Sequence, residues 1–83
     1  LPMAYSVLAN VYGKKQDAAR AEQVLQDGVK ATWDPGLVAG LADILTAGGN
    51  RAGAVGLLRS GVEKNPGDVV LREKLQAIEK ASR

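Results

Sequence analysis

Two stretches of the sequence, Tyr5-Ser-Val-Leu-Ala-Asn-Val-Tyr12 and Val38-Ala-Gly-Leu-Ala-Asp-Ile-Leu45, match when one is placed above the other. The match continues downstream at the same spacing, and its further pairs are Ala21 with Ala54, Leu25 with Leu58, Gly28 with Gly61, and Val29 with Val62. Residue 41 lies 33 positions after residue 8, and every other pair has the same separation without a gap. The chain therefore contains an internal repeat, which is typical of stacked helical or β-solenoid architectures.

Each repeat unit predicts two helices. Tyr5, Leu8 and Tyr12 recur at i, i+3 and i+7, the spacing of one face of an amphipathic helix. A second helix follows with Ala21 and Leu25 on its apolar face. Small residues at the matched positions would let two antiparallel helices approach closely, so each unit is expected to be a helical hairpin.

The residues between these segments are those that end and begin helices. Gly13-Lys-Lys-Gln16 is expected to break the first helix, and Asp17 can cap the next one by accepting from exposed backbone N–H groups. In the second unit, Gly48-Gly49 is the expected stop and Asn50 the expected cap. Asp34-Pro35 starts the helix between them, with Asp as the cap and Pro at the first helical position.

Residues 69–82 predict one more helix after Asp68, with a narrow apolar stripe of Leu71, Leu75 and Ile78. The polar residues Arg72, Glu73, Gln76, Glu79 and Lys80 cover the rest of its surface. A helix that is polar on all but one face suits the end of a stack, because nothing packs beyond it.

The first helix has the opposite character, since apolar residues occupy both of its flanks. These residues are Leu1, Met3, Tyr5, Val7, Leu8, Val11 and Tyr12. We expect an upstream repeat to pack there, which would make this chain the C-terminal end of a longer array. Self-association through the same helix is the alternative.

Glycine is unusually frequent in the second unit, where Gly40, Gly53, Gly56 and Gly61 fall inside predicted helices. Each costs roughly 0.5–1 kcal/mol relative to alanine in a helix. Close helix packing and a flexible groove that a partner can mould are the two explanations.

Composition narrows the classes of function. The 83 residues carry a net charge of +2 with no clustered basic run, which disfavours nucleic-acid binding. The chain has no His and no Cys, so the commonest general base, nucleophile pairs and zinc ligands are missing. No phosphate-binding loop or apolar segment of about 18 residues is present. We expect neither an enzyme nor a cofactor, metal or small-molecule substrate.

The pattern resembles the tetratricopeptide repeat: a large apolar residue, Leu-Gly/Ala, Tyr, Ala, a large apolar residue, a small one and then Pro. The first unit supplies Tyr5, Leu8-Ala9, Tyr12, Ala21, Leu25 and Gly28, and the second supplies Val38, Leu41-Ala42, Leu45, Ala54, Leu58, Gly61 and Pro66. The resemblance implies an all-α solenoid with repeats at residues 1–34 and 35–68 and a capping helix at residues 69–83. Such repeats serve many partners, so the fold signal is specific and the functional signal is weak.

The family resemblance also implies a concave groove lined by the first helix of each pair. Its positions carry over to Met3, Ser6, Val7, Asn10, Gly13, Lys14, Ala39, Gly40, Asp43, Thr46, Ala47, Val70, Glu73, Lys74 and Ala77. Asn10 can both donate to and accept from a bound backbone, although a solvated helix residue is the equal alternative. The expected function is a protein-interaction scaffold that holds a peptide or helical segment of a protein partner, within a larger bacterial assembly protein.

One subclass of the family clamps the carboxylate end of chaperone tails with asparagines and basic side chains. This chain keeps Asn10 and Lys74 at matching positions, but Ser6 and Val70 stand where Lys is expected and Asp43 replaces the second Asn. Because an acidic groove residue repels a carboxylate, an amphipathic or extended segment is the favoured occupant.

Two other functions stay open. The first unit is also similar to a pentatricopeptide repeat, and that similarity implies single-stranded RNA binding with Ser6 and Asp34 as the base-reading pair. The period of 33 and the low net charge argue against it. The third possibility is a purely structural segment that extends or dimerises its parent protein.

Overall fold

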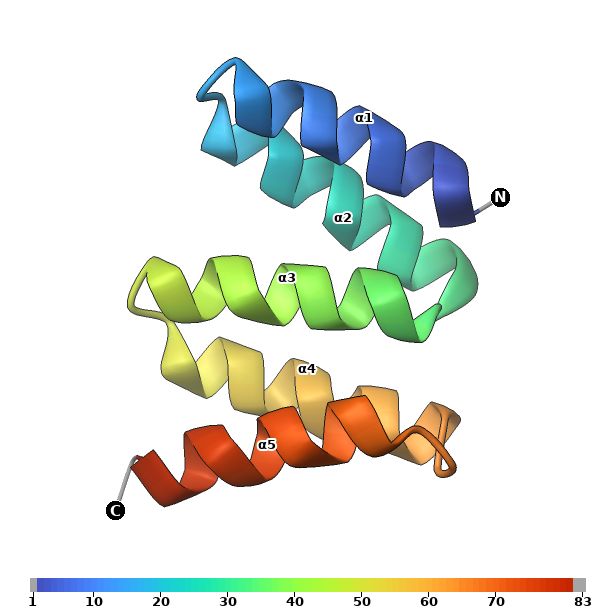
Figure 1. Ribbon diagram of the computed structural model, residues 1–83, viewed down its shortest axis with the longest axis vertical. Helices are drawn as coiled ribbons and strands as arrows, with labels where there is room; N and C mark the ends of the chain where they lie inside the picture. Colours follow the sequence, from blue (N-terminus) through green and yellow to red (C-terminus); the bar gives the residue numbers. More distant parts are fainter. Residues whose placement is uncertain (1, 82–83) are drawn as a thin grey trace.

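The computed structural model describes residues 2–81, and this part of the chain is all-α, as the sequence predicts, with no strand in it. Its five helices are α1 (Pro2–Lys14), α2 (Ala18–Thr32), α3 (Pro35–Ala47), α4 (Arg51–Lys64) and α5 (Val69–Ala81). Figure 1 shows each helix running antiparallel to the one before it. The α1–α2 hairpin, the α3–α4 hairpin and α5 follow one another along the long axis of a body measuring 34 × 26 × 16 Å.

The turns inside the two hairpins repeat one another bond for bond. Gln16 N–H donates to the Gly13 carbonyl over 3.0 Å, and 33 residues later Gly49 N–H donates to the Thr46 carbonyl over 3.1 Å. Gln16 and Gly49 both have positive φ, at 59° and 86°. The expected break in Gly13-Lys-Lys-Gln16 is confirmed: α1 ends at Lys14, and Gln16 adopts the left-handed conformation that makes the turn.

Side-chain caps begin the helices where the sequence predicts them. The Asp17 carboxylate accepts from Arg20 N–H over 3.2 Å, and the Asn50 amide oxygen, 33 positions later, accepts from Gly53 N–H over 3.0 Å. The Asp34 carboxylate accepts from Leu37 N–H in the same way, with Pro35 at the first helical position. Each cap satisfies one backbone donor that a helix N-terminus leaves without a partner.

The core lies where the helices meet and is aliphatic. Its most buried large side chains are Leu37, Val38, Leu58 and Leu71, each at most 1% exposed. Both members of three matched pairs are also buried, namely Ala9 with Ala42, Ala21 with Ala54, and Leu25 with Leu58. At these positions the internal repeat of the sequence is also a repeat of burial, whereas Leu8 is 45% exposed and its counterpart Leu41 only 4%.

Two matched glycines set how closely the helices pack. A Cβ at Gly28 of α2 would lie 2.8 Å from Cγ of Tyr5 in α1 and 2.9 Å from Cδ1 of Leu37 in α3. A Cβ at Gly61 of α4 would lie 2.8 Å from Cγ1 of Val38 in α3 and 3.3 Å from Cδ1 of Leu71 in α5. Each glycine is therefore the point where the second helix of a pair touches the first helix of its own pair and the helix that follows.

Helix α5 packs against α4 as α3 packs against α2, but no helix covers the face of α5 that corresponds to the α4-facing side of α3 within the described residues. Leu71 lies against Gly61 as Leu37 lies against Gly28, which makes Arg72 the counterpart of Val38. Whereas Val38 is fully buried under α4, Arg72 is exposed. The described residues of α5 thus present polar side chains on the face where α3 receives α4, as expected for a terminal helix.

Exposed apolar side chains gather on α1, again as predicted. Met3, Val7, Leu8 and Val11 are all exposed, together with Val69 and Val70 at the start of α5. None of the described helices combines the length and hydropathy needed to cross a bilayer.

The packing at Gly28 and Gly61 makes a testable prediction. Gly28→Ala or Gly61→Ala should overpack a three-helix contact, at a cost of about 1–3 kcal/mol, and regain only about 1 kcal/mol from helix propensity. Denaturant unfolding followed by circular dichroism should therefore show a lower midpoint for both variants. Gly56→Ala is the matched control, because no atom lies within 4 Å of a Cβ there. It should gain about 0.5–1 kcal/mol, and equal behaviour of all three variants would contradict the packing argument.

Candidate functional site

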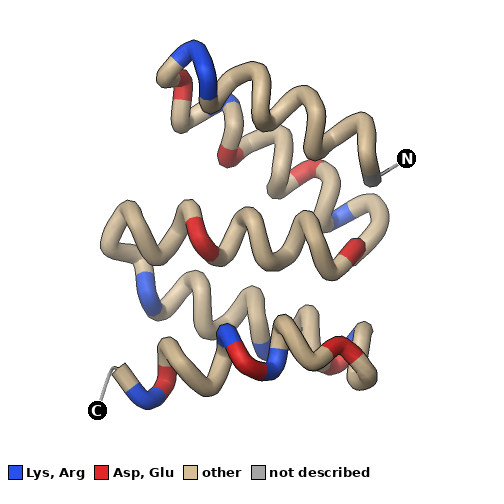
Figure 2. Tube along the Cα trace, in the orientation of Figure 1, with Lys and Arg blue, Asp and Glu red and all other residues tan. Residues whose placement is uncertain are grey.

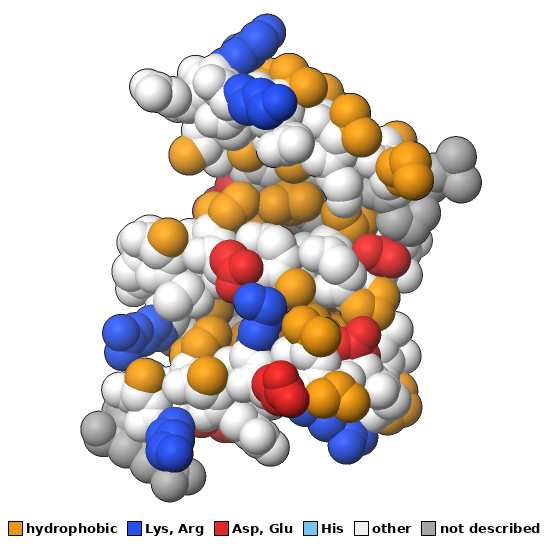
Figure 3. All heavy atoms as spheres, viewed as in Figure 1, with side chains coloured by type: hydrophobic (Ala, Val, Ile, Leu, Met, Phe, Trp, Pro, Cys, Tyr) orange, Lys and Arg blue, Asp and Glu red, His pale blue; other side chains and the backbone are white. Residues whose placement is uncertain are grey.

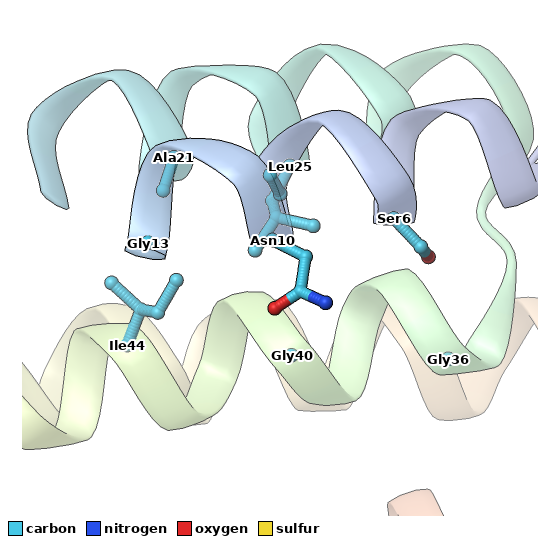
Figure 4. A pocket seen from close by; sticks show the side chains of 9 residues that line it. Ser6, Asn10, Gly13, Ala21, Leu25, Gly36, Gly40 and Ile44 are labelled. Carbon is cyan, nitrogen blue, oxygen red and sulfur yellow. The ribbon is translucent and has the colours of Figure 1, made fainter. Parts of the chain in front are cut away.

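A cleft with a volume of about 320 Å³ lies between α1 and α3. The second helix, α2, lies behind it and supplies its floor. The residues that line the cleft are Ser6, Ala9, Asn10, Gly13, Ala21, Leu25, Gly36, Gly40 and Ile44. Figure 4 shows them in place, and Figure 3 shows the same hollow between the α1–α2 hairpin and α3, with apolar side chains on its floor.

Glycines on the two walls keep the cleft open without being needed by the packing. A Cβ at Gly40 would meet only Cδ1 of Leu25, at an ordinary contact distance of 3.8 Å. At Gly13 it would meet nothing within 4 Å. Both residues are helical, where glycine costs roughly 1 kcal/mol relative to alanine. Neither the conformation nor the packing of these two residues requires glycine. The missing side chains would, however, let the backbone of a bound peptide approach α1 and α3 closely.

The polar groups of the cleft come from α1. Figure 4 shows the Asn10 amide extending from α1 towards the backbone of α3 near Gly40, and the Ser6 hydroxyl on the same side one turn earlier. Asn10 is exposed, and its amide takes part in none of the hydrogen bonds among residues 2–81. One donor and one acceptor are thus available beside a mostly apolar floor.

A cross-helix ion pair closes the neighbouring part of this surface. Lys74 Nζ of α5 donates to Asp43 Oδ1 of α3 over 2.9 Å. The two predicted groove residues are therefore brought together, but they neutralise each other instead of presenting separate charges. A carboxylate ligand would have to displace Asp43 to reach Lys74.

The structure places the other predicted groove residues less close to one another. Thr46 uses its hydroxyl to donate to the Ala42 carbonyl over 2.8 Å, within its own helix. Ala39 lines a shallow depression between α3 and α5 together with Val70. Lys14 and Glu73 are exposed, at the end of α1 and on α5.

Met3 and Val7 do not join Ser6 and Asn10 in the cleft. They lie on a different side of α1, in a shallow hollow formed with Ala4, Leu8 and Val11. The residues that sequence reasoning left out of the groove are Ala9, Ala21, Leu25, Gly36 and Ile44. Ala21 and Leu25 were placed on the apolar face of the second helix, and the repeat spacing alone does not reveal that they also line an open cleft.

The RNA-reading alternative requires Ser6 and Asp34 to act as a pair, but the two residues do different things in the structure. Ser6 lies in the cleft, but the Asp34 carboxylate accepts from Leu37 N–H over 3.2 Å as the cap of α3. Figure 2 shows Lys and Arg spread along the described chain beside acidic residues rather than gathered on one side. Nothing in this arrangement favours a nucleic-acid backbone.

Among residues 2–81, no three His, Cys, Asp or Glu side chains come together as a metal-binding group would. Comparison with known proteins finds no protein family, curated protein or solved structure that matches this chain. The candidate site therefore rests on the geometry described above.

The Asp43–Lys74 pair can be tested by a double-mutant cycle. Asp43→Lys and Lys74→Asp should each lower the free energy of unfolding by about 0.3–1 kcal/mol, the range for a surface pair, since the Asp43 side chain is 66% exposed. The double variant, which exchanges the two charges, should recover most of the loss in denaturant unfolding at low salt. Strictly additive losses in the double variant would show that the two side chains do not interact in solution.

Proposed function

We propose that this chain is a tetratricopeptide-like helical solenoid segment that acts as a protein-interaction scaffold, with the α1–α3 cleft holding an amphipathic helix or extended segment of a partner. The observation that carries the proposal is an open cleft with an apolar floor, glycine walls and one amide with free hydrogen-bonding groups. The repeat spacing of 33 residues, the hairpin turns and the buried small residues support the fold assignment.

The chemistry of the cleft defines the occupant. Leu25 and Ile44 offer apolar surface, so the partner should present one or two aliphatic side chains. Gly36 and Gly40 allow its backbone to lie close to α3, where the Asn10 amide can bond a peptide group. Asp43 accepts from the Lys74 ammonium and places its own negative charge beside it, which disfavours a terminal carboxylate and the chaperone-tail mode.

The cleft can be tested by filling it. Peptides selected from a displayed random library on the whole chain should lose at least about tenfold in affinity when Gly40→Leu places a side chain in the cleft. Gly56→Leu is the matched control, because it adds the same side chain to an exposed helical glycine with open space around it. Asn10→Ala should cost a further two- to tenfold, as expected for one net hydrogen bond of roughly 0.5–1.5 kcal/mol.

Fluorescence anisotropy with the selected peptides measures each of these affinities, and circular dichroism confirms that the variants fold. Peptides that bind Gly40→Leu and the parent chain equally would place the binding surface elsewhere. Tight, nuclease-sensitive binding of a random single-stranded RNA pool, lost in Ser6→Ala, would favour the RNA-reading alternative instead.

A further inference from the structure

A second surface, independent of the cleft, lies on the outer face of α1, which consists of Met3, Ala4, Val7, Leu8 and Val11. Its four large side chains are 76%, 58%, 45% and 42% exposed, in chain order. An exposed apolar row of this kind on a 13-residue helix needs an explanation, because none of the large apolar side chains of α2, α3 and α4 is exposed.

The repeat itself shows what covers such a face. The residues 33 positions after those of the outer face of α1 are Gly36, Leu37, Gly40, Leu41 and Ile44 of α3. Four of them lie against or beside α2. Leu37 lies against Gly28, a Cβ at Gly40 would lie 3.8 Å from Cδ1 of Leu25, Leu41 shares a depression with Val29 and Trp33, and Ile44 lies beside Ala18 and Ala19. Gly36, Gly40 and Ile44 also line the open α1–α3 cleft. The outer face of α1 therefore corresponds to the surface of α3 that the antiparallel helix α2 covers in part.

The outer face of α1 and the matching face of α3 differ in which positions carry large side chains and which carry small ones. On α3, the long side chain of Leu37 faces Gly28, and the space above Gly40 is taken by Leu25. On α1 the order is reversed, since Ala4 stands at the position of Leu37 and Val7 at the position of Gly40. A helix lying on α1 as α2 lies on α3 would need a large side chain opposite Ala4 and a small one opposite Val7.

We propose that the outer face of α1 binds an amphipathic helix of a partner polypeptide, antiparallel to α1, that carries a large aliphatic residue opposite Ala4 and glycine or alanine opposite Val7. This helix takes the place on α1 that α2 takes on α3. When the docked helix is aligned with α2, it should have a small residue at the position of Leu25 and a large one at the position of Gly28.

A second copy of this chain is the poorer occupant. Two α1 helices facing each other would set four large side chains against four, with Ala4 as the one small residue of each face. Head-to-tail stacking would oppose the apolar face of α1 to the outer face of α5, where Arg72, Gln76 and Glu79 stand at the positions of Val38, Ala42 and Leu45. Glu79 is moreover paired with Arg59 of α4 over 2.7 Å.

The test uses two synthetic helices made from residues 17–33. One keeps the native sequence, and the other exchanges the two sizes through Leu25→Gly and Gly28→Leu. Both carry a hydrocarbon staple between positions 23 and 27, which are exposed and bonded to each other across one turn in α2, so that the peptides are helical in isolation. Each is labelled at its N-terminus and titrated with the whole chain, and anisotropy is recorded.

We expect the exchanged peptide to bind at least about tenfold more tightly than the native one. Val7→Asp in the whole chain should abolish this binding, whereas Val69→Asp, at an equally exposed valine on α5, should leave it unchanged. Both positions are exposed, so neither variant should lose helicity by circular dichroism. The Gly40→Leu variant should bind the exchanged peptide normally, which separates this surface from the cleft.

Equal affinity of the two peptides, or binding of neither, would overturn the proposal. Sedimentation velocity of the chain alone tests whether a second copy of the chain covers this face. A dimer that Val7→Asp converts to monomers would show that a second copy covers this face, and the proposed helix would then be wrong.

Discussion

The close approach of three helices at one glycine is the constraint on which the rest of this structure depends. At Gly28, the backbone of α2 touches Tyr5 of α1 and Leu37 of α3, with no room for even a methyl group. Gly61 repeats the arrangement with Val38 and Leu71. Val38 cannot move aside, because it is fully buried and β-branched residues have essentially one χ1 rotamer in a helix. The same glycine thus sets how closely the two helices of a hairpin pack and how closely the next helix packs on that hairpin. The spacing between successive units therefore follows from the packing inside each unit.

This constraint explains why so much of the fold could be predicted from the sequence. The matched small residues, the caps Asp17, Asp34 and Asn50, and the 33-residue spacing all report on local packing that repeats. The sequence did not reveal features that depend on contacts between distant residues or on the backbone conformation of a single residue. Gln16 replaces glycine at a left-handed turn position, because the following cap and the Asp17 N–H bond to the Tyr12 carbonyl hold it there. No rule of composition identifies such a residue, so the segment 13–16 could be predicted to end α1 but the residue that makes the turn could not.

The candidate site was predictable only in part, for a geometrical reason. The groove positions carried over from the family resemblance include Ser6 and Asn10, and the structure places both in the cleft. The resemblance does not give the separation of α1 and α3, so it does not reveal that the buried residues Ala21 and Leu25 line the cleft between them. The same carry-over grouped Met3 and Val7 with Asn10, although they lie on the outer face of α1. The pairing of Asp43 with Lys74 joins residues 31 apart, beyond the reach of any local pattern.

Both proposed surfaces lie on α1, and this has a consequence for how they act together. Within residues 2–81, α1 is held by α2 and, more lightly, by α3, while its outer face has no cover. The position of α1 relative to α3 sets the width of the cleft. A helix docked on the outer face would bury Val7 and Leu8 and so restrict the motion of α1. A cleft of fixed width loses less conformational entropy when it binds a ligand, so a helix docked on the outer face is expected to raise the affinity of the cleft if it orders α1. Any such coupling is reciprocal, so a ligand in the cleft would then favour the docked helix by the same factor.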